Sequence, residues 1–136
     1  MRECLLLGRV KKVARMRISF SLILGFLLQT SAVAQTELTR GEILNGHLDV
    51  GDVAEYHIDL LAEQFVYGEV EQLSFDAKVT VLDPQGQITG NFNTSARGAD
   101  PIQFETPASG RYTFRVSSAD DQPGDYSISL QRIEAV

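Results

Sequence analysis

The residues that could carry out acid–base or metal chemistry are few and widely spaced in this 136-residue chain. His47 and His57 are the only histidines, and His57 alternates with Glu55 and Asp59, a pattern typical of the solvent-facing side of a strand. A catalytic or zinc-binding histidine needs a partner at a suitable spacing, and neither His-Glu-x-x-His nor paired cysteines occur. We interpret both histidines as solvated surface residues.

A hydrolytic nucleophile is also missing from the sequence patterns. There is no Gly-x-Ser-x-Gly elbow and no Ser-x-x-Lys motif. The nearest approach is Ser74-Phe75-Asp76-Ala77-Lys78, where the lysine follows one residue too late and no helical pattern surrounds it. The sequence therefore predicts a protein that is not an enzyme.

Carboxylates are the remaining groups that could bind an ion. Asp120, Asp121 and Asp125 cluster in one short segment, and Asp49 and Asp52 flank another turn. Calcium takes six to eight oxygen ligands, which such loops can supply, although neither spacing is that of an EF-hand. Aspartates also favour turns because their side chains bond the local backbone. Two interpretations remain open: a calcium site formed by Asp120, Asp121 and Asp125, or solvated turns with no cofactor.

The first 34 residues have the three parts of a secretory signal peptide. Six basic residues and one acid occupy positions 2–17, the apolar run Ile18–Leu28 follows, and Ala32-Val33-Ala34 fits a cleavage site before Gln35. The apolar run is shorter than the roughly 20 residues that a membrane-spanning helix needs. We predict cleavage between Ala34 and Gln35, a secreted or periplasmic protein without a membrane span, and Met16 as an alternative start.

Removal of this segment leaves a strongly acidic chain without cysteine. Six of the 12 basic residues and one of the 18 acidic residues precede Gln35, so residues 35–136 carry a formal charge of −11. Such a charge repels phosphate backbones and excludes nucleic acid as an expected partner. The single cysteine, Cys4, also precedes Gln35, so the remaining chain has neither a disulfide nor a thiol nucleophile.

A period of two in apolar residues dominates the rest of the chain and predicts half-buried antiparallel strands. Strands are expected at 53–60, 64–72, 77–82, 88–92, 102–104, 111–116 and 126–131, with an edge strand near 43–48. Seven or eight short strands separated by turns indicate one antiparallel β-sandwich, jelly-roll-like, over residues 41–133. Residues 35–40 are expected to be a short linker, and the polar stretch 91–100 a long loop.

Three short motifs, in their order and spacing, resemble the bacterial pre-peptidase C-terminal domain family. They are the Asp-Pro-x-Gly turn at 83–86, Gly-x-Tyr-x-Phe-x-Val at 110–116 and Gly-x-Tyr-x-Ile-x-Leu at 124–130. The resemblance extends over about residues 41–132. It implies a β-sandwich module attached to a secreted hydrolase, of the type found directly after the signal peptide in serine hydrolases. The family supplies no catalytic residues that could be transferred to this sequence.

Phe65 and Tyr67 are the residues most suggestive of a contact surface. The strand alternation places them opposite Val66 and Val70, and exposed aromatic side chains on a sheet often mark an interaction site. The alternative is a central strand that is buried on both faces. The functional hypothesis is a non-catalytic exported accessory module that assists a secreted hydrolase domain. The alternative is a stand-alone secreted binding protein, with or without calcium, for a protein or polysaccharide surface.

Overall fold

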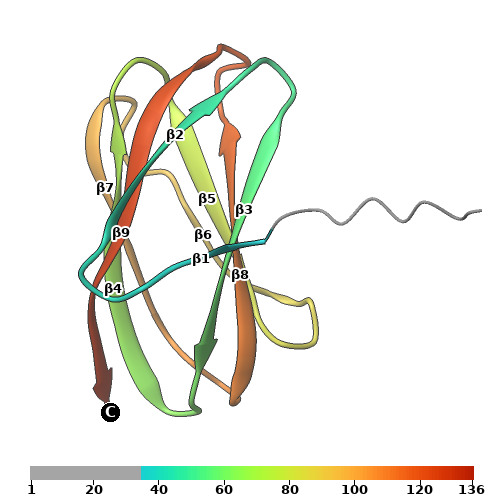
Figure 1. Cartoon of the computed structure of the whole chain (residues 1–136), viewed down its shortest axis with the longest axis vertical. Coiled ribbons are helices and arrows are strands. Elements are labelled where there is room, and N and C mark those ends of the chain that lie inside the picture. The colour runs from blue at the N-terminus through green and yellow to red at the C-terminus, as the bar shows by residue number, and fades with distance from the viewer. Residues whose placement is uncertain (1–34) are drawn as a thin grey trace, which may run out of the picture. The chain divides into compact units, whose positions relative to one another are not determined.

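The computed structural model describes residues 35–136, and the predicted signal peptide lies outside this part. Nine strands form two facing sheets (Figure 1). Sheet 1 has the order β1-β3-β8-β5-β6 and sheet 2 the order β2-β9-β4-β7. The strands are β1 Thr36–Glu37, β2 Ile43–Leu48, β3 Val53–Leu60, β4 Gln64–Gln72, β5 Ala77–Leu82, β6 Ile88–Phe92, β7 Gly98–Glu105, β8 Gly110–Ser118 and β9 Gly124–Ala135. This confirms the predicted all-β sandwich.

The core lies between the two sheets and consists of the inward members of each alternating strand. All strand pairs are antiparallel except the short parallel pair of β1 with β3. The largest fully buried side chains are Val66, Val70, Phe75, Val79, Val81, Ile102, Tyr112, Phe114, Val116, Tyr126, Ile128 and Leu130. Residues 35–136 form no helix, and hence none long and apolar enough to cross a membrane.

The motif residues that carry the family resemblance stabilise turns and the core. Asp83 Oδ1 accepts bonds from the backbone nitrogens of Gln85 and Gln87, both at 2.9 Å. Gly110 has a φ of 143° and lies against the Pro84 ring, where an added Cβ would come within 2.7 Å of Pro84 Cγ. The motif therefore needs glycine here for both conformation and space.

Two buried tyrosines of the same motifs bond to groups beyond their own strands. The Tyr112 hydroxyl donates to the carbonyl of Ala108 at 2.6 Å and so holds the turn between β7 and β8. The Tyr126 hydroxyl, from sheet 2, lies 2.6 Å from that of Tyr56, from sheet 1. Burial, together with this bond, raises the pKa of Tyr126. Both tyrosines therefore satisfy their polar ends inside the core.

The segment expected to be a linker is part of the fold. Residues 36–37 form β1, and the Leu38 nitrogen donates to the carbonyl of His57 at 2.8 Å. Leu38 is only 4% exposed and belongs to the core. The linker prediction was wrong because a two-residue strand is too short to produce a periodic pattern.

Half of the expected long loop at 91–100 belongs to strands. β6 runs to Phe92 and β7 begins at Gly98, so only residues 93–97 connect them. Asp100, on β7, is fully buried and accepts bonds from the nitrogens and hydroxyls of Thr94 and Ser95, at 2.8 to 3.1 Å. A buried carboxylate thus fixes a connection whose polar composition predicted an extended loop.

Candidate docking surface

Phe65 and Tyr67 lie on the outer face of sheet 2, as the alternation of β4 predicted, and each is partly exposed. Arg132 of β9 completes the group, with its guanidinium carbon 5.5 Å from the Phe65 ring centroid and 5.3 Å from that of Tyr67. Both distances are within the range of a cation–π contact. We call Phe65, Tyr67 and Arg132 the aromatic–arginine cluster.

A β-bulge brings Arg132 to this face. Gly68 pairs with Leu130 while Tyr67 pairs with Arg132, so Gln131 is an extra residue on β9. Without this extra residue, the alternation that buries Ile128 and Leu130 would direct Arg132 into the core. Bulges often redirect a side chain next to a functional site, and this one places a cation beside two aromatic rings.

Gly68 makes the bulge sterically feasible. A Cβ at this position would overlap the backbone oxygen of Ser129 and lie 2.7 Å from Leu130 Cδ2. The Ser129 oxygen is backbone of the central strand β9, which cannot move away without losing its pairing with β2 or β4. The close approach of the two backbones therefore requires glycine.

We expect Gly68→Ala to lower the free energy of unfolding by about 2 to 3 kcal/mol, because it overpacks the contact between β4 and β9. Chemical denaturation measures this loss. Gly51→Ala is the control: it has a positive φ, 86°, but open space around an added Cβ. It should cost only about 1 kcal/mol of backbone strain. Equal losses for both variants would contradict the steric account of the bulge.

Acidic side chains surround the aromatic–arginine cluster. Glu69 accepts a 3.2 Å bond from the Tyr67 hydroxyl, and Glu134 lies 3.5 Å from Arg132. Desolvation and the bond to Glu69 raise the pKa of Tyr67. Glu105 lies on the neighbouring strand β7, where it pairs with Phe65. The surface therefore combines an aromatic and guanidinium centre with a carboxylate rim, groups that can form a protein contact.

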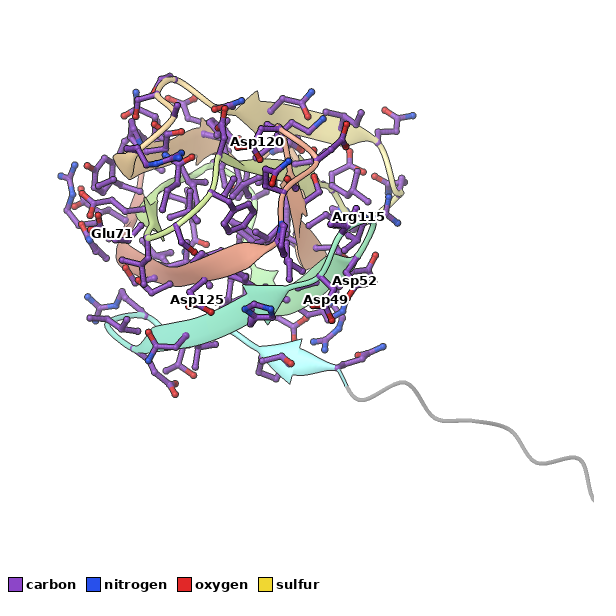
Figure 2. The ribbon with its side chains drawn as sticks, turned by 90° about the horizontal axis from the view of Figure 1, so that it is seen from above. Asp49, Asp52, Glu71, Arg115, Asp120 and Asp125 are labelled. Carbon is purple, nitrogen blue, oxygen red and sulfur yellow. The ribbon has the colours of Figure 1, made fainter. Side chains whose placement is uncertain are left out.

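The structure does not bring the three predicted calcium ligands together. Asp120 accepts bonds from Ser118 Oγ at 3.0 Å and from the backbone nitrogen of Asp76 at 3.3 Å, and Asp121 is exposed with a φ of 58°. Asp125 binds His47 instead, and Figure 2 shows it well separated from Asp120. Within residues 35–136, no group of three or more His, Cys, Asp or Glu side chains is arranged to hold a metal. Asp120 therefore bonds groups of neighbouring turns, and Asp125 forms an ion pair with His47.

His47 is solvent-exposed, as predicted, and forms a small charged group with two of these acids. Its Nδ1 lies 2.7 Å from Asp125 Oδ1, and its Nε2 lies 3.4 Å from Asp49 Oδ1. The hydrogen bond with Asp125 raises the pKa of the imidazole above its ordinary value, against a smaller desolvation effect. The favourable pairing is therefore present at low pH and is lost as the pH rises through the folded-state pKa of His47.

We expect Asp125→Asn to bring the pKa of His47 down toward its ordinary value, since the largest cause of the increase is removed. An NMR titration of the His47 ring protons measures it. Asp52→Asn, in the same loop as Asp49 but without a contact to His47, should leave the titration unchanged. An unchanged His47 pKa in Asp125→Asn would contradict the ion pair.

His57 differs from its predicted solvated state. Its side chain is only 8% exposed, and its Nδ1 lies 3.1 Å from Thr113 Oγ1 on the neighbouring strand β8. Glu37 of β1 pairs directly with it, and the alternation of β3 gave no sign of this additional strand.

Ser74, the serine of the imperfect Ser-x-x-Lys match, has a structural contact. Its Oγ accepts a bond from the Asp125 nitrogen at 2.8 Å and so holds a turn.

Sequence reasoning missed two important residues. Asp100 is in phase with the inward Ile102 and Phe104, so a carboxylate at an inward position was the signal that could have identified it. Arg132 gave no such signal, because its orientation depends on an unpaired residue in a strand that otherwise alternates regularly.

No family model and no curated protein matches this chain. Solved structures do match its fold. The pre-peptidase C-terminal domain of collagenase from Bacillus anthracis is 12% identical, with a TM-score of 0.60, and the match covers 76% of this chain and 100% of that domain. The chain therefore has the pre-peptidase C-terminal domain fold, as the three sequence motifs predicted.

A second group of solved structures shares the fold. PliG of Aeromonas hydrophila, a periplasmic inhibitor of g-type lysozyme, is 22% identical with a TM-score of 0.51, covering 72% of this chain and 100% of its own. PliG of Salmonella Typhimurium is 18% identical with a TM-score of 0.53, covering 74% and 98%. At these identities, the likeness extends to the fold alone.

Proposed function

We propose that this protein is a non-catalytic exported module that docks on a secreted hydrolase domain through the aromatic–arginine cluster on sheet 2. The observation that carries the proposal is the bulge at Gln131, which exposes Arg132 beside Phe65 and Tyr67. The bulge keeps the charge of Arg132 out of the core and lets Ile133 pack against the core instead. It also gives the outer face a cation that is already held beside two aromatic rings, which is a preformed centre for a contact surface.

The composition of the cluster favours a protein partner over a polysaccharide. Aromatic residues and arginine are enriched at the energetic centres of protein interfaces. Sugar recognition by stacking needs open ring faces, whereas the Arg132 guanidinium lies over both rings. A protein partner can instead pack directly on the planar Arg132 guanidinium, which leaves its contacts with the two rings in place.

Export and the hydrolase partner rest on two kinds of support. The N-terminal sequence has the pattern of a signal peptide, and the solved structures of this fold include a collagenase domain and periplasmic inhibitors. The inhibitors also favour a second candidate, a stand-alone protein that binds a separate hydrolase. Both functions use a non-catalytic sandwich, and they differ in whether the hydrolase belongs to the same polypeptide.

The mass of the native exported polypeptide, measured together with its associated proteins, tests the proposal. A polypeptide larger than residues 35–136 that contains a hydrolase domain supports the attached module. A polypeptide of residues 35–136 in a complex with a separate hydrolase supports the stand-alone candidate. An isolated monomer of residues 35–136 that forms no complex with any hydrolase of its own exported fraction would contradict both.

A further inference from the structure

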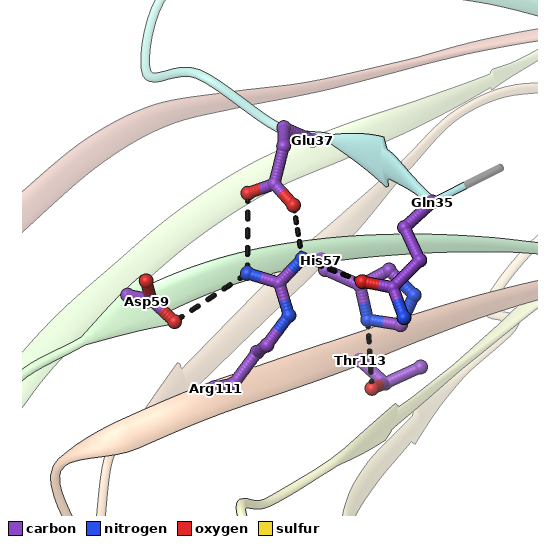
Figure 3. Close-up of polar contacts among 6 residues, drawn as sticks. All are labelled: Gln35, Glu37, His57, Asp59, Arg111 and Thr113. Atoms are coloured by element: carbon purple, nitrogen blue, oxygen red, sulfur yellow. Dashed lines mark hydrogen bonds and ion pairs between the residues drawn. The ribbon is translucent and has the colours of Figure 1, made fainter.

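Gln35, the first described residue, has its side chain held by Arg111. Its amide oxygen Oε1 accepts a bond from Arg111 Nη2 at 2.9 Å (Figure 3). The guanidinium is itself oriented by Glu37, which it pairs with through both terminal nitrogens, and by Asp59 at 3.5 Å. The Gln35 amide therefore faces a cation whose planar donors are already fixed in direction.

The backbone that follows Gln35 keeps this contact in place. Thr36 and Glu37 pair with β3, and the next residue, Leu38, is buried in the core. The Leu38 nitrogen bonds the carbonyl of His57 on the same strand. Gln35 is thus tethered to the sandwich at a fixed position beside Arg111.

We propose that Gln35 is a modification site: as the N-terminal residue it cyclises to pyroglutamate, with Arg111 promoting the reaction. The proposal rests on the predicted cleavage between Ala34 and Gln35 and is independent of the docking function. The α-amino nitrogen attacks the side-chain carbon Cδ and forms the N–Cδ bond of a five-membered lactam. The Cδ–Nε2 bond breaks, and Nε2 leaves as ammonia with the proton released by the attacking nitrogen.

Arg111 can assist because negative charge develops on Oε1 in the tetrahedral intermediate. Its Nη2 already bonds this oxygen at 2.9 Å in the unreacted amide, so a cationic donor lies beside the atom on which the charge develops. The lactam of the product keeps a carbonyl oxygen that can accept a bond. Cyclisation also removes the positive charge of the terminal amine.

Mass spectrometry of the native exported protein, with the N-terminal peptide sequenced, tests the modification. The expected terminal peptide begins at residue 35 and is lighter than the encoded peptide by one ammonia. Gln35→Ala is the control, because it has no side-chain amide and should lose no ammonia. A persistent free Gln35 amine, or a native N-terminus at another residue, would overturn the proposal.

The role of Arg111 is tested by the rate of ammonia loss in freshly collected protein. We expect Arg111→Met to react on the order of tenfold more slowly, less than the hundredfold or more for a buried oxyanion donor, because Arg111 is 39% exposed. Arg111→Lys, which keeps the charge, should react at a rate between those of Arg111→Met and the unchanged protein. Glu37→Gln removes the ion pair that orients Arg111 but keeps the guanidinium, so it should slow the reaction less than Arg111→Met does. Thermal unfolding verifies that each variant is folded. Equal rates for Arg111→Met and the unchanged protein would overturn the assigned role.

Discussion

Replacing Asp100 with alanine is expected to lower the free energy of unfolding by about 3 to 5 kcal/mol, because hydrogen bonds to a buried charged group are costly to remove. Its carboxylate is fully buried and accepts four bonds, from the nitrogens and hydroxyls of Thr94 and Ser95. Alanine would leave both nitrogens without this acceptor and open a gap beneath residues 93–97. The free energy of unfolding of a domain of this size is roughly 5 to 15 kcal/mol, so the variant should be close to unfolding.

Chemical denaturation of three variants separates this effect from general sensitivity to losing an acid. Asp100→Asn keeps the shape of the side chain and one acceptor oxygen, so its free energy of unfolding should fall less than that of Asp100→Ala. Asp52→Ala removes an exposed carboxylate, with the same change in net charge, and should change the free energy of unfolding by no more than about 0.5 kcal/mol. If Asp100→Ala were as stable as Asp52→Ala, Asp100 would not fix the 93–97 connection.

The double substitution Phe65→Ser and Tyr67→Ser is expected to weaken docking to the hydrolase by about a hundredfold or more while the sandwich stays folded. Residues at the energetic centre of an interface contribute about 2 kcal/mol or more each, and a loss of about 1.4 kcal/mol is tenfold in affinity. Both rings lie on the outer face of sheet 2, so the core beneath them, including Val66 and Val70, keeps its packing.

Affinity for the hydrolase domain identified with the native protein, measured by calorimetry, provides the test. Ile88→Ser is the control, since Ile88 is an exposed apolar residue, 63% exposed, on β6 of the other sheet. It should change neither affinity nor stability. A double variant that loses its fold, rather than its affinity, would show that the two rings are structural.

Period-two alternation was sufficient to predict the sandwich, because each strand has one buried and one exposed face. β3 and β4 coincide with the predicted ranges 53–60 and 64–72, and Phe65 and Tyr67 lie on the predicted face. Alternation reports which residues share a face. It does not report what covers that face, which is why His57 was expected in solvent although it lies beside β1.

Long-range register accounts for most of what the sequence did not reveal. Arg132 joins Phe65 and Tyr67 only because Gln131 is unpaired, and nothing within β9 itself marks that position. Asp125 was grouped with Asp120 because the two are close in sequence, whereas pairing of β2 with β9 places it opposite His47. Proximity along the chain was a poor guide to which charged groups meet.

Oxidative footprinting of the native exported assembly tests the central claim most directly, because it works even when the partner has not been identified. The oxidation rates of Phe65 and Tyr67 would be compared between that assembly and the isolated polypeptide of residues 35–136. If a partner covers the aromatic–arginine cluster, both residues should react several-fold more slowly in the assembly while exposed Ile88 reacts equally in the two samples. Equal rates for Phe65 and Tyr67 in both samples would contradict docking through this surface.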